Sequence, residues 1–240
     1  MARRFGAAEY LYTNQGRVTV SPRTLSAWFK ADNFAADRHI VATCSTANWN
    51  GYVVMYSRTT GRVALNIQGA IIQSTTTVTA GKWHHGCLVE YSNDSRAIFL
   101  DGGGKATDAS VRNPTGIDNL TIGARAVGNG IFNEFLGEIA EVAVYQAALT
   151  DEEVMLLARG ISPLSVRGRA LTYYVPLVGT DLSDCMARLV MSQRAGIPAV
   201  VAHPPLYRPA VRRFRVGTPA APSAVLSPYY YLHLLQGAPL

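Results

Sequence analysis

Glu138 and Glu141 are the residues in this sequence that most directly suggest chemistry, because two carboxyl groups beside a sugar could hydrolyse a glycosidic bond. Retaining hydrolysis needs these groups about 5 Å apart on one side of the sugar. The surrounding stretch, GEIAEVAVYQ (137–146), has the apolar and β-branched residues of a strand, in which successive side chains point to opposite faces. A spacing of three then predicts carboxylates on opposite sides of a sheet, so we expect no catalytic site and no enzyme.

A second set of candidates lies in KWHHGCLVEYS (82–92), where histidines could bind a metal ion. His84 and His85 are adjacent, so in a strand they would face opposite ways and could not share one ion. His85 and Cys87 would share a face, but no second pair of ligands lies nearby at zinc spacing. The alternation from Trp83 to Tyr91 instead predicts one inward-facing row with a structural role.

Calcium is the other metal to consider, because it binds through carboxylate and carbonyl oxygens that leave little trace in a sequence. No loop gathers acidic residues in a D-x-D-x-D pattern, and no glycine-rich loop has the spacing of a nucleotide site. We therefore predict no cofactor, with bound calcium as the alternative. Its oxygen-bearing candidates are Asp37, Asn93, Asp94, Asp101 and Asp118.

Strands must position most of these residues. Up to about residue 147, short segments rich in β-branched and aromatic residues alternate with clusters of Gly, Asn, Asp and Ser. This pattern predicts an all-β fold, an antiparallel two-sheet jelly-roll sandwich. We expect strands within 24–32, 51–57, 62–69, 71–80, 82–92, 96–107, 118–126, 135–146 and 171–190.

One short helix is expected over about residues 151–159. Thr150 followed by Glu153 has the spacing of a capping box, in which each side chain bonds the backbone amide of the other residue. Val154 and Leu157 would lie on one face, and Gly160 is placed to end the helix in a left-handed conformation.

Charge and proline content change towards the C-terminus. The net charge is +6, yet no acidic residue follows Asp184 whereas six arginines do, so the first 184 residues are neutral. Eight of the twelve prolines lie in residues 198–240. We therefore divide the chain into a domain, 1–197, and an extended Pro/Arg-rich C-terminal arm, 198–240.

The arm could contact phosphates, add a strand to a neighbouring subunit, or fold back on its own domain. Its candidate partner-binding residues are Tyr207, Arg208, Arg212, Arg213, Phe214 and Arg215.

Three cysteines at scattered positions, Cys44, Cys87 and Cys185, favour free thiols made in a reducing cytosol. No apolar run approaches the ~20 residues that a membrane helix needs. The start of the chain, MARRFGAAEYLYT, has no apolar segment after its arginines, so we expect no signal peptide and no membrane partner.

Trp83-His84-His85, Leu100-Asp101-Gly102 and the join from Gly137 to Glu153 occur in this order along the chain. Together they resemble the laminin G-like, pentraxin-related branch of the concanavalin A-like jelly rolls over about residues 5–160. The resemblance implies a two-sheet sandwich that binds surfaces, sugars or proteins and is usually not catalytic. Some glucanases of this fold carry an E-x-D-x-x-E strand motif, and Ala140 stands where the middle acid would be.

The continuation of the chain, ISPLSVR (161–167), YYVPL (173–177) and AHPPLYRP (202–209), resembles virion proteins encoded by tailed phages. This second resemblance implies a non-enzymatic structural protein of a virion, assembled in the host cytoplasm. We expect a phage head decoration or cement protein, a homo-oligomer whose arm binds the major capsid protein or other virion subunits. Nucleic acid is not expected as a partner.

The alternative is a carbohydrate-binding adhesin of a phage tail or fibre. Aromatic side chains bind sugars by stacking on their rings, and a cluster of aromatic residues lies in the segment 49–56. The residues predicted to stack on a sugar are Trp49, Tyr52 and Tyr56.

Overall fold

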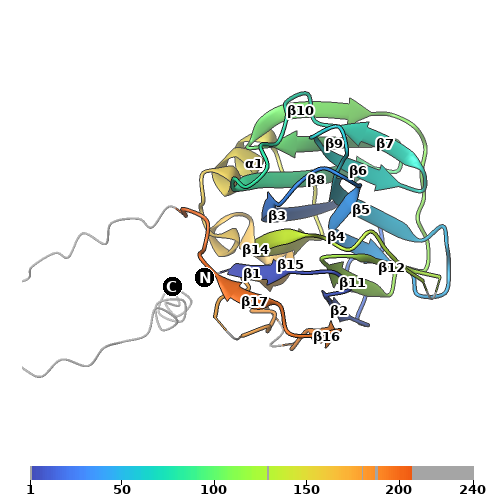
Figure 1. The fold of residues 1–240 in the computed structure, drawn as a ribbon. Helices are drawn as coiled ribbons and strands as arrows, with labels where there is room; N and C mark the ends of the chain where they lie inside the picture. Colours follow the sequence, from blue (N-terminus) through green and yellow to red (C-terminus); the bar gives the residue numbers. More distant parts are fainter. Residues whose placement is uncertain (1, 129, 180, 187–188, 207–240) are drawn as a thin grey trace, which may run out of the picture. The chain divides into compact units, whose positions relative to one another are not determined.

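Two antiparallel sheets packed face to face form the body of the protein (Figure 1). The computed structural model describes residues 2–128, 130–179, 181–186 and 189–206. Sheet A has eight strands in the order β10-β9-β8-β3-β14-β1-β17, with β15 also paired to β14. Sheet B has seven strands in the order β16-β2-β11-β4-β5-β6-β7. The predicted all-β antiparallel sandwich is confirmed.

The strands are three to nine residues long. Sheet A consists of β1 (Ala2–Phe5), β3 (Arg23–Ala31), β8 (His84–Ser92), β9 (Ser95–Leu100), β10 (Gly103–Asp108), β14 (Gly137–Tyr145), β15 (Leu171–Val175) and β17 (Ala199–Val201). Sheet B consists of β2 (Tyr10–Thr13), β4 (Arg38–Cys44), β5 (Tyr52–Ser57), β6 (Val63–Ile67), β7 (Ala70–Gln73), β11 (Asn119–Ile122) and β16 (Ser192–Arg194). A separate hairpin joins β12 (Arg125–Val127) to β13 (Gly130–Phe132). The expected segments did not include β1, β2, β4, β13, β16 and β17, and the strand expected over 71–80 ends at Gln73.

The space between the sheets is filled by alternate residues of the strands. In β3, Leu25, Ala27 and Phe29 point into this core and are fully buried. Ile139 of β14 lies opposite Phe29 in the register and joins the same core. Burying a leucine or phenylalanine side chain contributes about 1.5–3 kcal/mol, so this alternation fixes which face of each sheet is outward.

A buried ion pair interrupts the apolar core near one end of sheet A. Arg23, Glu90 and Arg96 lie side by side on β3, β8 and β9, on the same face as Leu25. Arg23 Nε lies 2.7 Å from Glu90 Oε2, and all three side chains are almost completely buried. The carbonyl oxygens of Asn93 and Ser110 accept hydrogen bonds from Arg96. Burial raises the pKa of Glu90, although the two guanidinium groups oppose the rise.

The outer face of sheet A is covered by the helix α1 (Asp151–Ala158) and the segment that follows it. Cys87 and Val89 of β8 pack there with Val154 and Leu157 of the helix. The row of alternating residues from His85 was predicted to face inward. It is buried as expected, but beneath the helix layer and not between the two sheets, because Leu88 of the same strand occupies the inner face.

The predicted helix and its ends are confirmed. The Thr150 side chain accepts a hydrogen bond from the Glu153 amide at 3.3 Å, and the Glu153 carboxylate accepts one from the Thr150 amide at 2.8 Å. Gly160 has φ +81° and follows the C-cap, where its amide donates to the Leu157 carbonyl. The Ile161 amide donates to the Leu156 carbonyl, which completes a Schellman motif.

A β-bulge in β14 overturns the prediction that Glu138 and Glu141 face opposite sides. The register with β3 shifts between Ala140 and Ala143, so that two residues of β14 lie opposite the single residue Ala27. Glu141 is the first residue of this bulge and has φ +54°. The extra residue reverses the alternation, and both glutamates therefore lie on the outer face of sheet A.

The C-terminal part of the described chain completes both sheets. Strand β16 pairs with β2 at the edge of sheet B, and β17 pairs with β1 at the edge of sheet A. Sheet A thus includes residues 199–201, which composition alone had assigned to the arm. The described chain up to Leu206 belongs to one compact unit, 1–208, and residues 209–240 lie outside the described residues.

The three cysteines are free, as predicted. Burial raises the pKa of the Cys44 thiol to about 12, and it raises that of Cys87 still further. In the described part of the chain, no helix has the length and apolar character needed to span a membrane.

Candidate functional site

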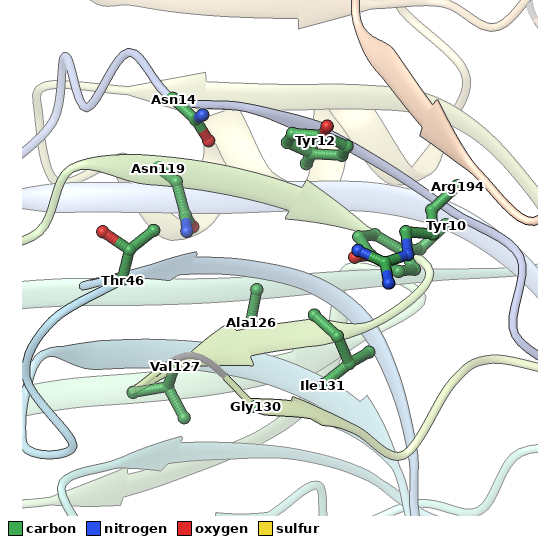
Figure 2. A pocket seen from close by; sticks show the side chains of 10 residues that line it. All are labelled: Tyr10, Tyr12, Asn14, Thr46, Asn119, Ala126, Val127, Gly130, Ile131 and Arg194. Carbon is green, nitrogen blue, oxygen red and sulfur yellow. The ribbon is translucent and has the colours of Figure 1, made fainter.

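A cavity of about 170 Å³ lies on the outer face of sheet B, beneath the β12–β13 hairpin (Figure 2). Strands β2, β11 and β16 form one side of it, and the hairpin forms the other. The described residues that line it are Tyr10, Tyr12, Asn14, Thr46, Asn119, Ala126, Val127, Gly130, Ile131 and Arg194. A second cavity, of about 10 Å³, lies beside Glu141.

Alternation in β2 places two tyrosines in this cavity. Leu11 points into the core between the sheets, so Tyr10 and Tyr12 on either side of it point outward. Their ring centroids are 5.8 Å apart and the rings are inclined by 44°. Tyrosines in this arrangement offer apolar ring surface and two hydroxyl groups to a ligand.

Asn119 supplies an unusual polar group to the wall of the cavity. The residue is only 2% exposed, and its Oδ1 atom is buried with no hydrogen-bond partner among the described residues. An unpaired buried acceptor costs about 1–3 kcal/mol. Nearby, the side chain of Thr46 is held by Asp118, which accepts from the Thr46 amide at 2.8 Å and from its hydroxyl at 2.6 Å.

Arg194 provides the only charge among the described residues of the wall. It lies opposite Tyr10 in the β16–β2 register, and Figure 2 shows the two side chains together at the end of the cavity away from Thr46 and Asn119. Burial raises the pKa of Tyr10, and the neighbouring Arg194 guanidinium opposes this rise. No carboxylate of the described residues forms an ion pair with Arg194.

The hairpin is fixed in place by aromatic and cationic contacts on the neighbouring strands. The Arg125 guanidinium lies 4.6 Å from the ring centroid of Tyr52 and 5.2 Å from that of Phe132. His39 of β4 is hydrogen-bonded through Nδ1 to the Phe132 carbonyl at 3.0 Å. Trp49 packs against Phe132 with ring centroids 5.5 Å apart.

The three residues predicted to stack on a sugar therefore lie around the hairpin in different environments. Trp49 is 56% exposed, and Tyr52 is half-buried beneath Arg125. Tyr56 is 3% exposed and its ring packs against that of His39, so almost none of its surface can reach a sugar and the expectation for this residue is corrected. None of the three lines the cavity.

Comparison with known proteins places this architecture in a family. A family model described as the concanavalin A-like lectin/glucanases superfamily matches residues 5–155. The chain belongs to this superfamily. The laminin G-like, concanavalin A-like resemblance in the sequence is thereby confirmed. The matched region contains every described residue of the cavity except Arg194.

Solved structures of the superfamily fold agree with the sheet arrangement. A heptameric SAP-like pentraxin from Limulus polyphemus has a TM-score of 0.56 and 19% identity, over 68% of this chain and 82% of that protein. A putative carbohydrate binding protein from Bacteroides ovatus has a TM-score of 0.58 and 19% identity, over 80% of this chain and 57% of that one. The CBM40 of a Ruminococcus gnavus IT-sialidase, bound to α2,3-sialyllactose, has a TM-score of 0.55 and 16% identity, over 65% of this chain and 96% of that one. At these sequence identities the similarity shows a shared fold and nothing more. No curated protein matches the chain.

Some members of the superfamily are glucanases, so the acidic residues of β14 require a closer description. Glu138 Oε1 lies 3.1 Å from Lys30 Nζ and 3.5 Å from Arg4 Nη1. Glu141 accepts a hydrogen bond from the Tyr174 hydroxyl at 2.5 Å, and His203 Nε2 lies 2.9 Å from its other oxygen. Both carboxylates are thus occupied by protein groups.

Glu141 borders the second cavity, which measures only about 10 Å³. Ser26 Oγ and His85 Nε2 are 2.8 Å apart in its wall, a buried pair that the sequence analysis did not predict. Burial lowers the pKa of His85 to about 4. A volume of this size holds about one water molecule and no sugar. The cavity is lined by Ser26, Trp28, His85, Glu141, Leu157, Ile161, Pro163 and Leu206.

The candidate calcium ligands have separate partners. Asp101 accepts from His84 Nδ1 at 2.7 Å and from the His85 amide at 2.8 Å. Asp37 accepts from the Thr59 amide, and Asp118 from Thr46. Asn93 and Asp94 accept from Ser21 and Ser92. Within the described ranges, no group of three or more His, Cys, Asp or Glu side chains is placed to hold a metal ion.

The predicted arm residues lie outside the described part of the chain, which ends at Leu206. They are Tyr207, Arg208, Arg212, Arg213, Phe214 and Arg215.

Several residues of the larger cavity were missed by the sequence analysis. The alternation in EYLYTN (9–14) carries a signal for an outward row of Tyr10, Tyr12 and Asn14, because a single leucine separates the two tyrosines. Arg194 has no comparable signal. It lies on a three-residue strand whose side chains are all exposed, and only the fold brings it opposite Tyr10.

Proposed function

We propose that this protein is a non-enzymatic carbohydrate-binding protein that takes one sugar unit in the cavity beneath the β12–β13 hairpin. Its fold is that of lectins and carbohydrate-binding modules. Drug-sized ligands occupy pockets of about 300–1,000 Å³. A cavity of 170 Å³ is smaller, which suits a single ring at the end or on a branch of a glycan.

The unpaired Oδ1 atom of Asn119 is the observation that carries this proposal. A buried acceptor without a donor destabilises the free protein and is satisfied when a ligand brings a hydroxyl group to it. Sugars present several such hydroxyls on a partly apolar ring. Tyr10 and Tyr12 supply aromatic surface and hydroxyl groups on the neighbouring strand of the same wall.

The substitution Asn119→Ala tests this proposal, because it should have opposite effects on stability and on glycan binding. Asn119→Ala removes the unpaired acceptor, so we expect unchanged or higher stability in urea together with at least a tenfold loss of affinity for glycans found on an array. Asn113→Ala is the matched control, because Asn113 is exposed and lies outside the cavity wall. Full glycan binding by the Asn119→Ala variant would overturn the proposal.

The absence of catalysis is part of the proposal and is supported by the contacts of the two glutamates. Lys30 and Arg4 occupy Glu138, while Tyr174 and His203 occupy Glu141. Turnover of a polysaccharide by the purified chain, lost in a Glu141→Gln variant, would contradict this part.

A second candidate function is a structural role in a virion, as a head decoration or cement protein located in the particle. It is supported by the acid-free end of the sequence, where six arginines follow Asp184. In this proposal residues 209–240 bind a capsid protein or neighbouring copies of this chain. A variant lacking 209–240 is expected to fold, because 1–208 is a compact unit, but not to join particles. Normal incorporation of the truncated protein would contradict this role. The alternative to a head protein is a carbohydrate-binding adhesin of a phage tail or fibre, which would use the proposed sugar site.

A further inference from the structure

We infer that the sugar unit taken by the cavity beneath the β12–β13 hairpin carries an anionic substituent, and that Arg194 is the residue that selects it. This inference rests on the proposed carbohydrate-binding function. It adds the chemical class of the ligand and a specificity-determining residue that lies outside the region matched by the superfamily, 5–155.

Arg194 is available to an anion because protein carboxylates do not occupy it. Several guanidinium groups of the body form ion pairs with carboxylates; for example, Arg4 lies 2.6 Å from Asp32, and Arg167 lies 2.8 Å from Glu153. No described carboxylate lies within ion-pair distance of Arg194, and the cavity wall that the structure describes contains no acidic residue. A guanidinium group binds carboxylate, sulfate or phosphate through two parallel hydrogen bonds.

Tyr10 adds a donor at the same place. It lies directly opposite Arg194 in the β-ladder, and its hydroxyl is protonated at neutral pH, as that of an ordinary tyrosine is. A protonated phenol can donate to an anion, so Tyr10 and Arg194 together offer a neutral and a cationic donor at one end of the cavity (Figure 2).

At the opposite end of the cavity, Asn119 requires a different chemical group of the ligand. Asn119 Oδ1 is a buried acceptor and needs a donor, which an anion cannot supply. The ligand must therefore present a hydroxyl or amide N–H towards Asn119 and a negative charge towards Arg194. A neutral sugar satisfies only the first requirement, and a free inorganic anion satisfies only the second. A sugar bearing a carboxylate or a sulfate satisfies both.

Binding of matched sugars to the full chain tests the inference. The probes are pairs that share the rest of the ring and differ at C6, where one member carries an anionic group: glucuronic acid against glucose, galacturonic acid against galactose, and glucose 6-sulfate against glucose, each followed by calorimetry at low salt. We expect the preferred acidic member to bind at least tenfold tighter than its neutral partner, with the preference falling as salt is added. The carboxylated and sulfated pairs show which anion is recognised.

Arg194→Gln should abolish this preference, so that the acidic and neutral members of a pair bind with equal affinity, while the unfolding midpoint stays unchanged. Arg169→Gln is the matched control, because Arg169 is exposed and lies outside the cavity. Equal binding of acidic and neutral sugars would overturn the inference and leave the proposed function standing. Binding of no sugar in these pairs or on a glycan array would overturn both. Displacement of the sugars by inorganic sulfate at equal concentration would also overturn the inference, because the hydroxyl groups would then contribute nothing.

Discussion

Glu138 and Glu141 lie on the same face of sheet A although only two residues separate them. The bulge between Ala140 and Ala143 produces this arrangement, and Glu141 adopts φ +54° at its first position. Left-handed conformations of this kind favour glycine, because a Cβ atom costs about 1–2 kcal/mol there. The contacts of Glu141 with Tyr174 and His203 offset this cost and connect β14 to β15 and to the C-terminal segment.

Within a strand, an alanine variant is usually more stable than the glycine variant of the same position. At position 141 we expect the reverse. Both variants lose the contacts of the carboxylate, but only alanine keeps the strained backbone, so we expect Glu141→Gly to be about 1 kcal/mol more stable than Glu141→Ala. Urea unfolding at neutral pH measures the difference. Glu138 has no positive φ, and there alanine should be more stable than glycine by about 0.5–1 kcal/mol. The same order at both positions would show that the bulge is absent.

The end of the helix can be tested with a matched pair of threonines. Thr150→Ala removes the acceptor of the Glu153 amide, and we expect a loss of about 1 kcal/mol in the free energy of unfolding. Thr77→Ala is the control, because Thr77 is exposed and lies outside helices and strands. Equal stabilities of the two variants would mean that the capping box contributes nothing.

The helix and the sandwich could be predicted because their signals are local. The spacing of Thr150 and Glu153 specifies a cap, and alternating apolar residues specify which strand faces meet. The bulge at Glu141 could not be predicted in the same way, since a glutamate carries no preference for a positive φ. The cavity depends on pairings between residues far apart in the chain. Arg194 meets Tyr10 only because β16 pairs with β2, and neither segment alone indicates this contact.

Acid should destabilise the protein before its carboxylates titrate, because two histidines are buried in the neutral form. Burial lowers the pKa of His39 and of His85 from 6.5 to about 4, and the charge of Arg125 further lowers that of His39. Between pH 6.5 and 4 the unfolded chain binds protons that the folded chain does not, so stability is complete above this window and falls as pH decreases through it. The loss should approach about 3 kcal/mol per histidine.

The quantity to measure is the slope of the free energy of unfolding against pH between pH 6.5 and 5, because most carboxylates titrate below this interval. Urea unfolding across these pH values should show a shallower slope in the His39→Asn and His85→Asn variants, and the shallowest in the double variant. A slope that stays unchanged in all three would contradict the assignment of the pH dependence to these side chains.

Glu90 should be among the residues whose charge matters most for stability, because it lies between two buried guanidinium groups. Glu90→Gln keeps the size of the side chain but leaves the buried Arg23 without its carboxylate partner, whereas Arg96 keeps Asp108 at 3.6 Å, and we expect a loss of about 3–5 kcal/mol in urea unfolding at pH 7. Glu152→Gln, on the exposed face of the helix, should cost less than about 0.5 kcal/mol.

Replacing Arg23 and Glu90 together, as Arg23→Met with Glu90→Leu, should recover much of the loss of stability, because apolar groups of similar volume often substitute for a buried ion pair. A double variant less stable than Glu90→Gln would show that the ion pair, and not the penalty of an unpaired charge, stabilises this end of the sandwich.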